Sequence, residues 1–359
     1  MAPKGNNKRA RISTKPRVML SDSNRFGNNL QAEATLSNGK AKALQLPLEL
    51  LMEVMSHFKA VSTGIIYGHS SRGLDSSYLE RTDALRSLSQ TCKLWRYIFF
   101  PLLWERLDVF ATHSQSGAWY QVFGETMIRK CFLVTENQEI ASHVRTMSVI
   151  LSRYSTSTVL PAFVRGVEAL PNLKTLRIIS AHDKMTTALK TAFDGHIFPQ
   201  IETVILPTHA HNILRSCPEV KRVICIDGCD ASKLISAIAK ECRKVEEIER
   251  FTFQSERLMK RLVKATPNLR SIKFHLPVEP AILKPLAASK NLSHITLQSS
   301  CSAPKDALND ARVSACNQTA KDVLKQSKSN GPKSIALEYD PNNDYCRRGH
   351  EAWTERIYL

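Results

Sequence analysis

The hydrophobic residues beyond position 140 repeat one spaced pattern. An apolar residue is followed by two variable residues, a second apolar residue, one variable residue and a third apolar residue. The pattern occurs at Val144-x-x-Met147-x-Val149, Leu173-x-x-Leu176-x-Ile178, Ile201-x-x-Val204-x-Leu206, Val220-x-x-Val223-x-Cys225, Leu269-x-x-Ile272-x-Phe274 and Leu292-x-x-Ile295-x-Leu297. Val245-x-x-Ile248 begins a degenerate seventh copy, in which Phe251 and Phe253 fall out of register. The pattern predicts a series of short strands at regular spacing.

Runs with helical spacing lie between these strands. Leu234, Ile235 and Ile238 form one stripe, Met185, Leu189 and Phe193 form another, and a third, at Leu258, Met259 and Leu262, has Ser255 as its expected cap. One strand and one helix in about 25 residues is the unit of a leucine-rich-repeat solenoid. The stretch from Cys217 to Cys229 resembles the cysteine-containing type of that repeat. The alternative is an ordinary α/β domain with alternating short strands and helices.

The pattern before residue 110 predicts helices. From Leu48 to Phe58, the residues Leu51, Val54, Met55 and Phe58 are spaced as one buried helix face, while Leu48, Leu50 and Met52 lie outside that stripe. A small unit cannot bury both sides of such a helix, so we expect the second side to meet a partner. The alternative is a central helix of a larger core. A second stripe follows a serine- and glycine-rich loop and consists of Leu85, Leu88, Cys92, Trp95 and Phe99.

Three motifs in this region resemble an F-box. They are the opening Leu46-Pro47-Leu48-Glu49-Leu50-Leu51, the helix end at Cys92-Lys93-Leu94-Trp95-Arg96, and Pro101-Leu102-Leu103-Trp104. The whole chain is similar to fungal-type F-box proteins with a leucine-rich-repeat-like C-terminal domain. The chain departs from the F-box pattern in its link between the first two helices, at about 59–81, which is about twenty residues longer than usual. A surface loop can lengthen in this way at small cost, because the entropy of loop closure rises only with the logarithm of loop length.

The resemblance implies a three-helix module that binds the Skp-type adaptor of cullin-RING ubiquitin ligases. The residues that would divide between this adaptor interface and the packing of the module are Leu46, Pro47, Leu50, Leu51, Val54, Leu85, Leu88 and Trp95. The sequence does not assign each residue to one of the two.

Together these patterns predict an α/β fold in four parts. Residues 1–44 form a disordered basic tail, 45–107 the F-box helical module, 108–300 an irregular leucine-rich-repeat-like solenoid, and 301–359 a C-terminal cap or partly ordered tail. In the last part we expect a helix at Asp306–Ser327, with Ala311, Ala315, Val323 and Leu324 as its apolar positions, and a strand at Ile335–Tyr339.

The formal net charge of +17 makes a polyanion a possible partner. The first 45 residues contain nine Lys or Arg against Asp22 and Glu33. Much of the excess positive charge therefore lies in the tail, and the remainder is spread thinly over the rest of the chain. Lys8-Arg9-Ala10-Arg11 and Lys15-Pro16-Arg17 suit either a nuclear import signal or a solvated tail.

The chain begins without an apolar signal core and contains no apolar stretch near the ~18 residues that cross a bilayer. Its nine cysteines are odd in number. We therefore expect a soluble protein with reduced thiols, in the cytoplasm, the nucleus or both.

Cys217, Cys225, Cys229 and Cys242, with His209 and His211, are the candidates for a metal site. Zinc ligands usually occur in tighter pairs, so buried thiols are the favoured interpretation. The sequence contains no phosphate loop, dinucleotide fingerprint or nucleophile elbow. We expect no catalytic residue, no metal and no cofactor.

The residues between the apolar positions of each strand should face the concave side of a solenoid. The charged ones proposed to bind a target are Lys174, Arg177, Lys221, Arg222, Glu246, Glu247, Arg270 and Lys273. Glu202 and Glu249 add to the acidic side, and such a mixture suits a protein partner. The function expected is a non-catalytic, substrate-recognition subunit of a ubiquitin ligase. The alternative is a nucleic-acid-associated or scaffold repeat protein.

Overall fold

The computed structural model describes residues 47–58, 79–110, 112, 117–227, 231–274, 277–299, 301, 303–339 and 353–359. The predicted tail, Leu46 and most of the predicted 59–81 link lie outside these residues. The chain divides into two compact units, Met1–Glu53 and Val54–Leu359. Helix α1 (Leu48–Ser56) begins in the first unit and ends in the second.

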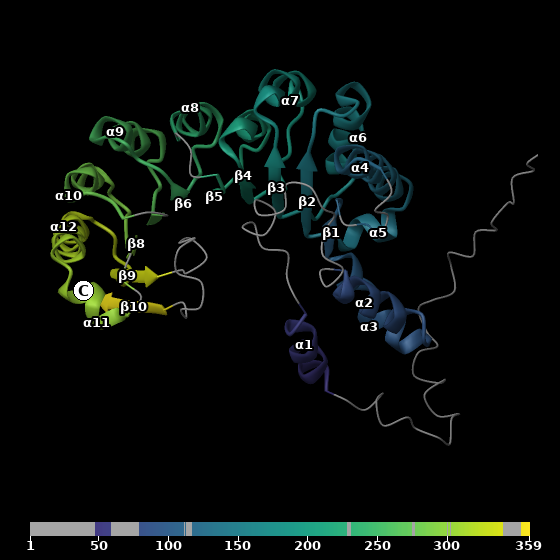
Figure 1. Cartoon of the computed structure of the whole chain (residues 1–359), viewed down its shortest axis with the longest axis horizontal. Helices are drawn as coiled ribbons and strands as arrows, with labels where there is room; N and C mark the ends of the chain where they lie inside the picture. Colours follow the sequence, from purple (N-terminus) through teal and green to yellow (C-terminus); the bar gives the residue numbers. More distant parts are fainter. Residues whose placement is uncertain are drawn as a thin grey trace, which may run out of the picture. The chain divides into compact units, whose positions relative to one another are not determined.

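The second unit contains a ten-stranded sheet in which the strands lie side by side in chain order (Figure 1). The strands are β1 (Arg106–Asp108), β2 (Thr146–Leu151), β3 (Thr175–Ala181), β4 (Thr203–Leu206), β5 (Arg222–Cys225), β6 (Glu247–Phe251), β7 (Ser271–Phe274), β8 (His294–Gln298), β9 (Ser334–Tyr339) and β10 (Trp353–Tyr358). Strands β1 to β9 are parallel, and β10 pairs antiparallel with β9. Parallel neighbours require a crossover between them, which the helices provide.

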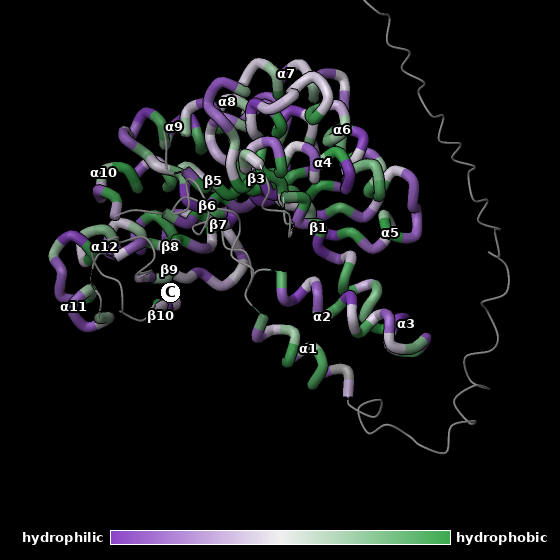
Figure 2. The backbone as a smooth tube through the Cα atoms, turned by 45° about the vertical axis from the view of Figure 1, so that its right-hand side comes forward, coloured by the Kyte–Doolittle hydropathy of each residue, from purple (hydrophilic) through white to green (hydrophobic). Residues whose placement is uncertain are grey.

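These helices lie along one side of the strands (Figure 1). They are α4 (Trp119–Glu136), α5 (Gln138–His143), α6 (Thr156–Glu168), η5 (Asp183–Met185), α7 (Thr186–Phe193), η6 (Thr208–Ser216), α8 (Ser232–Glu241), α9 (Glu256–Ala265), α10 (Pro280–Leu283), η7 (Lys284–Ala288), α11 (Pro304–Asn309) and α12 (Ala311–Gln326). Hydrophobic residues concentrate along the strands, and hydrophilic residues on the outer turns of the helices (Figure 2). The core therefore lies between sheet and helices.

One apolar residue from each of nine strands forms a continuous row through this core. The row runs Leu107, Met147, Leu176, Val204, Val223, Ile248, Ile272, Ile295 and Ile335, each paired in register with the next. None of the nine side chains is more than 3% exposed. This apolar row fixes the register of the sheet, because a slip of one residue would turn every member to the opposite face.

The predicted strand positions are confirmed as strands with buried apolar residues. All three apolar positions of the six full copies are at most 3% exposed. The degenerate copy keeps Ile248 in register, and the pairing then shifts so that Phe251 lies opposite Phe274. Arg250, with φ of 62°, lies at this shift. A backbone bulge therefore accounts for the displaced phenylalanines.

One helix prediction is confirmed and another needs correction. Ser255 does cap α9, since its side chain accepts a hydrogen bond from the Leu258 N–H at 3.4 Å. The helix expected at Asp306–Ser327 is instead two helices, because the Asp310 side chain accepts from the Arg312 and Val313 N–H groups and starts α12 anew. Ala311 and Ala315 are exposed, and the buried positions of α12 are Cys316, Ala320, Val323 and Leu324.

The stripe from Leu85 to Phe99 forms two helices, α2 (Glu80–Ser89) and α3 (Lys93–Trp104). Because α2 begins at Glu80, Thr82 and Asp83 lie inside its first turn and do not cap it. The two helices pack together, and α3 also packs against α5 and β1. Leu85 and Phe99 are fully buried.

Truncating the apolar row should destabilise the fold strongly. Leu176 is 0% exposed, and Leu176→Ala should cost about 2–5 kcal/mol of unfolding free energy, because it leaves a cavity in a close-packed core. Urea unfolding followed by circular dichroism measures the change. Thr175→Ala, one residue away on the opposite face, is the control and should cost less than about 1 kcal/mol. Equal costs would contradict the assigned register.

The contact of α4 with α6 depends on Gly166. A Cβ at this position would lie 2.7 Å from Cys131 Sγ and 2.9 Å from Cys131 Cβ. Gly166→Ala should therefore destabilise the protein by about 1–3 kcal/mol. Gly331→Ala is a matched control, since its nearest neighbour would be Ser329 Oγ at 3.8 Å. Adding Cys131→Ala should recover part of the loss in thermal unfolding; no recovery would mean that the strain lies elsewhere.

Candidate functional site

Helix α1 exposes the apolar side chains of Leu50, Met52 and Val54. Pro47 starts the helix, and its carbonyl accepts from the Leu50 and Leu51 N–H groups at 3.2 and 3.3 Å. Leu50 and Val54, one turn apart, are 53% and 58% exposed, and Pro47 is exposed as well. Leu51 is half-buried and Met55 is buried. The prediction that Val54 shares the buried stripe is therefore wrong: Leu51 and Met55 lie on the adjacent face of the helix, and Phe58, which is half-buried, follows the helix.

The remaining predicted adaptor residues lie on α2 and α3. Leu85 is 0% exposed and contributes to packing, whereas Leu88 and Trp95 are half-buried. The Trp95 ring packs edge-on against Phe99, with 5.6 Å between ring centroids.

Two exposed apolar residues of α3 were missed from the sequence. Leu94 and Tyr97, at i and i+3, are 45% and 71% exposed. They lie on one side of the helix, off the buried stripe. Their apolar character on a second side of α3 is the signal that could have identified them.

The sheet has an open face, formed by the strand residues that alternate with the apolar row. One line of this open face runs in register through Arg106, Thr146, Thr175, Thr203, Arg222, Glu247, Ser271 and His294. Another, two residues further along each strand, runs through Asp108, Ser148, Arg177, Ile205, Ile224, Glu249, Lys273 and Thr296.

A charged row borders the open face where the strands begin. Its members, Lys174, Glu202, Lys221, Glu246 and Arg270, follow one another through backbone hydrogen bonds from each N–H to the carbonyl of the preceding member, at 2.7–3.0 Å. The charges alternate in sign from Lys174 to Arg270. Lys174 Nζ lies 2.6 Å and Lys221 Nζ 3.6 Å from the Glu202 carboxylate, and Arg270 Nε lies 3.5 Å from Glu246.

The proposed target-binding charges thus pair largely with one another. Arg222 contacts both Glu247, at 3.3 Å, and Glu249, and Lys273 contacts Glu338. Arg177 is half-buried, and burial lowers the pKa of its guanidinium while the nearby Asp108 opposes the shift. Pairs this exposed contribute little to stability. Their main effect is to leave few unpaired charges on strands β4 to β9.

Three of the candidate metal ligands, Cys217, Cys225 and Cys242, are buried thiols within the repeated units, and Cys229 lies outside the described residues. Cys217 and Cys242 are 0% exposed, and Cys242 Sγ lies 3.0 Å from the carbonyl of Leu214, to which the thiol can donate. Burial raises the pKa of Cys225 and Cys242 to about 12 and raises that of Cys217 as well. His211 is buried, with Nδ1 2.9 Å from the Thr208 carbonyl. Among the described residues, no group of three His, Cys, Asp or Glu could hold a metal ion.

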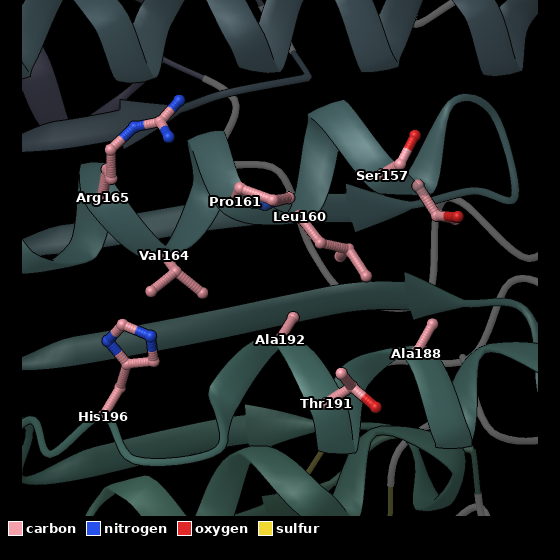
Figure 3. Close-up of a pocket in the computed structure, with 10 residues that line it drawn as sticks. Ser157, Leu160, Pro161, Val164, Arg165, Ala188, Thr191, Ala192 and His196 are labelled. Carbon is pink, nitrogen blue, oxygen red and sulfur yellow. The ribbon is translucent and has the colours of Figure 1, made fainter.

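An open groove of about 610 Å³ separates α6 and α7. Leu160 and Val164 of α6 lie across from Ala188 and Ala192 of α7 (Figure 3). At one end is His196, whose Nδ1 lies 2.6 Å from Glu168 Oε1. Half of the lining residues are aliphatic, namely Leu160, Pro161, Val164, Ala188 and Ala192.

Comparison with known families finds a match for the segment that contains α1, α2 and α3. Residues 43–109 match the F-box-like family. The F-box-like segment contains α1, α2, α3 and β1, and with them all the predicted adaptor residues; the resemblance noted for residues 46–104 is confirmed. No curated protein matches the chain. In the described part of the chain, no helix has both the length and the apolar character needed to cross a membrane.

The buried thiols should be chemically inert in the native protein. Only a thiolate is an efficient nucleophile, so their raised pKa values keep these groups unreactive near neutral pH. With iodoacetamide at pH 8, peptide mass spectrometry should find the exposed Cys92 alkylated, and Cys131, Cys217, Cys225 and Cys242 protected until urea is added. Alkylation of Cys217 or Cys242 at the rate of Cys92 would contradict the burial.

Proposed function

We propose that this protein is a substrate-recognition subunit of a cullin-RING ubiquitin ligase of the SCF type. The F-box-like segment binds a Skp-type adaptor, which connects it to a cullin. The chain itself is a non-catalytic subunit, acting in the cytoplasm or nucleus. The observation that carries this proposal is the exposure of Leu50 and Val54 within the segment that matches the F-box-like family.

Two sets of exposed apolar residues are proposed to contact the adaptor, one on α1 and one on α3. Leu50 and Val54 supply the first set, and Leu94 and Tyr97 the second. Fully burying one such aliphatic side chain contributes about 1.5–3 kcal/mol, so a few of them suffice as binding hot spots. Leu85, Met55 and Phe99 are buried within the chain and act in packing.

The second proposed interface is the open face of the sheet. Three features support a leucine-rich-repeat-like solenoid, of the kind suggested by the resemblance to fungal-type F-box proteins. They are the consecutive parallel strands, the apolar row with one buried residue from each of β1 to β9, and the helices along one side of the sheet. Such a sheet presents an extended surface to a target protein. The ion pairs along β4 to β9 favour a protein over a nucleic acid, which would require a uniformly basic track.

Charged substitutions on α1 should weaken adaptor binding. Both side chains are already solvated in the free chain, so Leu50→Asp with Val54→Asp leaves the core intact but places charge in an apolar interface. Co-purification with a Skp-type adaptor should fall at least about tenfold, a loss of about 1.4 kcal/mol. Calorimetry of the unbound protein should show an unchanged unfolding temperature.

Phe132→Asp with Ile197→Asp provides the matched control. These two apolar residues are 65% and 69% exposed but lie outside the F-box-like segment. The control variant should retain adaptor binding. If the α1 variant binds the adaptor as well as the wild type does, the adaptor proposal is wrong.

A further inference from the structure

The open face has an uneven charge distribution. On β4 to β9 and the charged row beside them, every proposed basic contact residue lies within 4 Å of a carboxylate: Lys221 with Glu202, Arg222 with Glu247, Arg270 with Glu246, and Lys273 with Glu338. This part of the face is close to neutral. A strongly charged partner would have to break existing pairs to bind there.

The β1–β3 end differs. Arg106 begins β1, Arg145 immediately precedes β2, and Arg81 lies in the first turn of α2. None of these three arginines forms an ion pair with any residue that the structure describes. Arg145 is exposed, and Arg81 and Arg106 are half-buried, so all three remain accessible to a ligand. Glu105 and Asp108 are the carboxylates whose charge opposes the effect of burial on Arg81.

The guanidinium groups of Arg81 and Arg106 lie close enough to repel each other. The backbone N–H of Arg145 donates to the carbonyl of Glu105, the residue before Arg106, at 2.9 Å. Burial lowers the pKa of Arg81, and the positive charge of Arg106 lowers it further. Arg106 has the same effect on Arg177, against the opposing effect of Asp108. Positive charge therefore accumulates at this end beyond what the two carboxylates neutralise.

Hydroxyl groups lie beside this charge. Thr146, Thr175 and Thr203 occupy adjacent register positions next to Arg106, and all three are half-buried. Each hydroxyl can donate to an anionic oxygen. Ser148, between Asp108 and Arg177 in the neighbouring line, is fully buried, and its Oγ has no hydrogen-bond partner among the described residues. Donors and positive charge thus converge on one end of the sheet.

We propose that the β1–β3 end of the open face binds an anionic segment of a target protein, with Arg81, Arg106 and Arg145 as its charge contacts. Arginine forms paired hydrogen bonds with carboxylate or phosphoryl groups, and both are candidates for the anionic side chains. The inference rests on the proposed function, in which this face holds a target. A protein segment is favoured over nucleic acid because the open-face positions of β1 to β8 carry no Phe, Tyr or Trp for base stacking.

Fluorescence anisotropy with the full-length chain tests this inference. The probes are a labelled glutamate-rich peptide, a phosphoserine peptide of equal charge, a glutamine-substituted peptide, and a single-stranded oligonucleotide. One or both anionic peptides should bind, and the comparison identifies carboxylate or phosphoryl as the preferred group. Binding should weaken as salt is raised. Arg106→Glu with Arg145→Glu should weaken it at least about tenfold.

Arg243→Glu with Arg257→Glu is the matched control. It makes the same change in net charge at exposed positions after α8 and on α9, and should alter binding less than twofold. Arg106→Gln with Arg145→Gln serves if the charge reversal unfolds the protein, and should show a smaller loss in the same direction. The glutamate and the glutamine variants of Arg106 and Arg145 should both bind the Skp-type adaptor normally. Loss of peptide binding is therefore separable from loss of the adaptor function.

Three results would overturn the inference. The glutamine peptide could bind as tightly as the anionic ones, which would remove charge as the basis of recognition. The Arg106/Arg145 variant and its control could bind equally well, which would move the site elsewhere. The oligonucleotide could bind more tightly than both peptides and lose affinity in the Arg106/Arg145 variant, which would make nucleic acid the ligand of these arginines.

Discussion

The apolar row from Leu107 to Ile335 is the constraint on which the second unit depends. Each member is buried between sheet and helices and is paired in register with the next member on the adjoining strand. Because side chains alternate along a strand, burying this row fixes which residues reach the open face. The same constraint requires a helical crossover between parallel neighbours, and so places the helices on the buried side of the sheet.

The electrostatics of the open face follow from this register. Residues next to a buried one are brought beside the equivalent residue of the next strand, about 4.8 Å away, whatever their separation in sequence. Lys174 meets Glu202, and Arg222 meets Glu247, across 28 and 25 residues of chain. Their pairing leaves the middle of the face neutral and Arg106 and Arg145 unmatched at one end. Where the face is neutral, shape and hydrogen bonding must decide any recognition; at the β1 end, charge can decide it.

The F-box-like segment differs from the sheet in leaving several apolar side chains exposed. Its helices are too few to bury all of their apolar surface, and Leu50, Val54, Leu94 and Tyr97 stay in water in the isolated chain. Such exposure is costly and is explained most simply by a protein partner. Packing residues such as Leu85 and Phe99 are distinguished from these only by their burial.

The sequence predicted the strands well because their apolar spacing is local and repeated. It missed β1, although Trp104-x-x-Leu107-x-Val109 fits the same spacing, because Trp104 and Leu107 fall within the predicted F-box helical module at 45–107. It misplaced Val54 because two stripes on one short helix share the same residue types. The ion pairs of the open face could not be predicted from spacing alone, since they depend on which residues the register sets side by side. The antiparallel β10 has no copy of the repeat and was missed for that reason.

Hydrogen-exchange mass spectrometry of the full-length chain, with and without a purified Skp-type adaptor, tests the central claim most directly. The account predicts that the adaptor slows exchange in α1 and α3 and leaves strands β2 to β8 unchanged, because the two proposed interfaces lie on different elements. Unchanged exchange in α1, or protection confined to the strands, would contradict the assignment of the exposed helix residues to the adaptor.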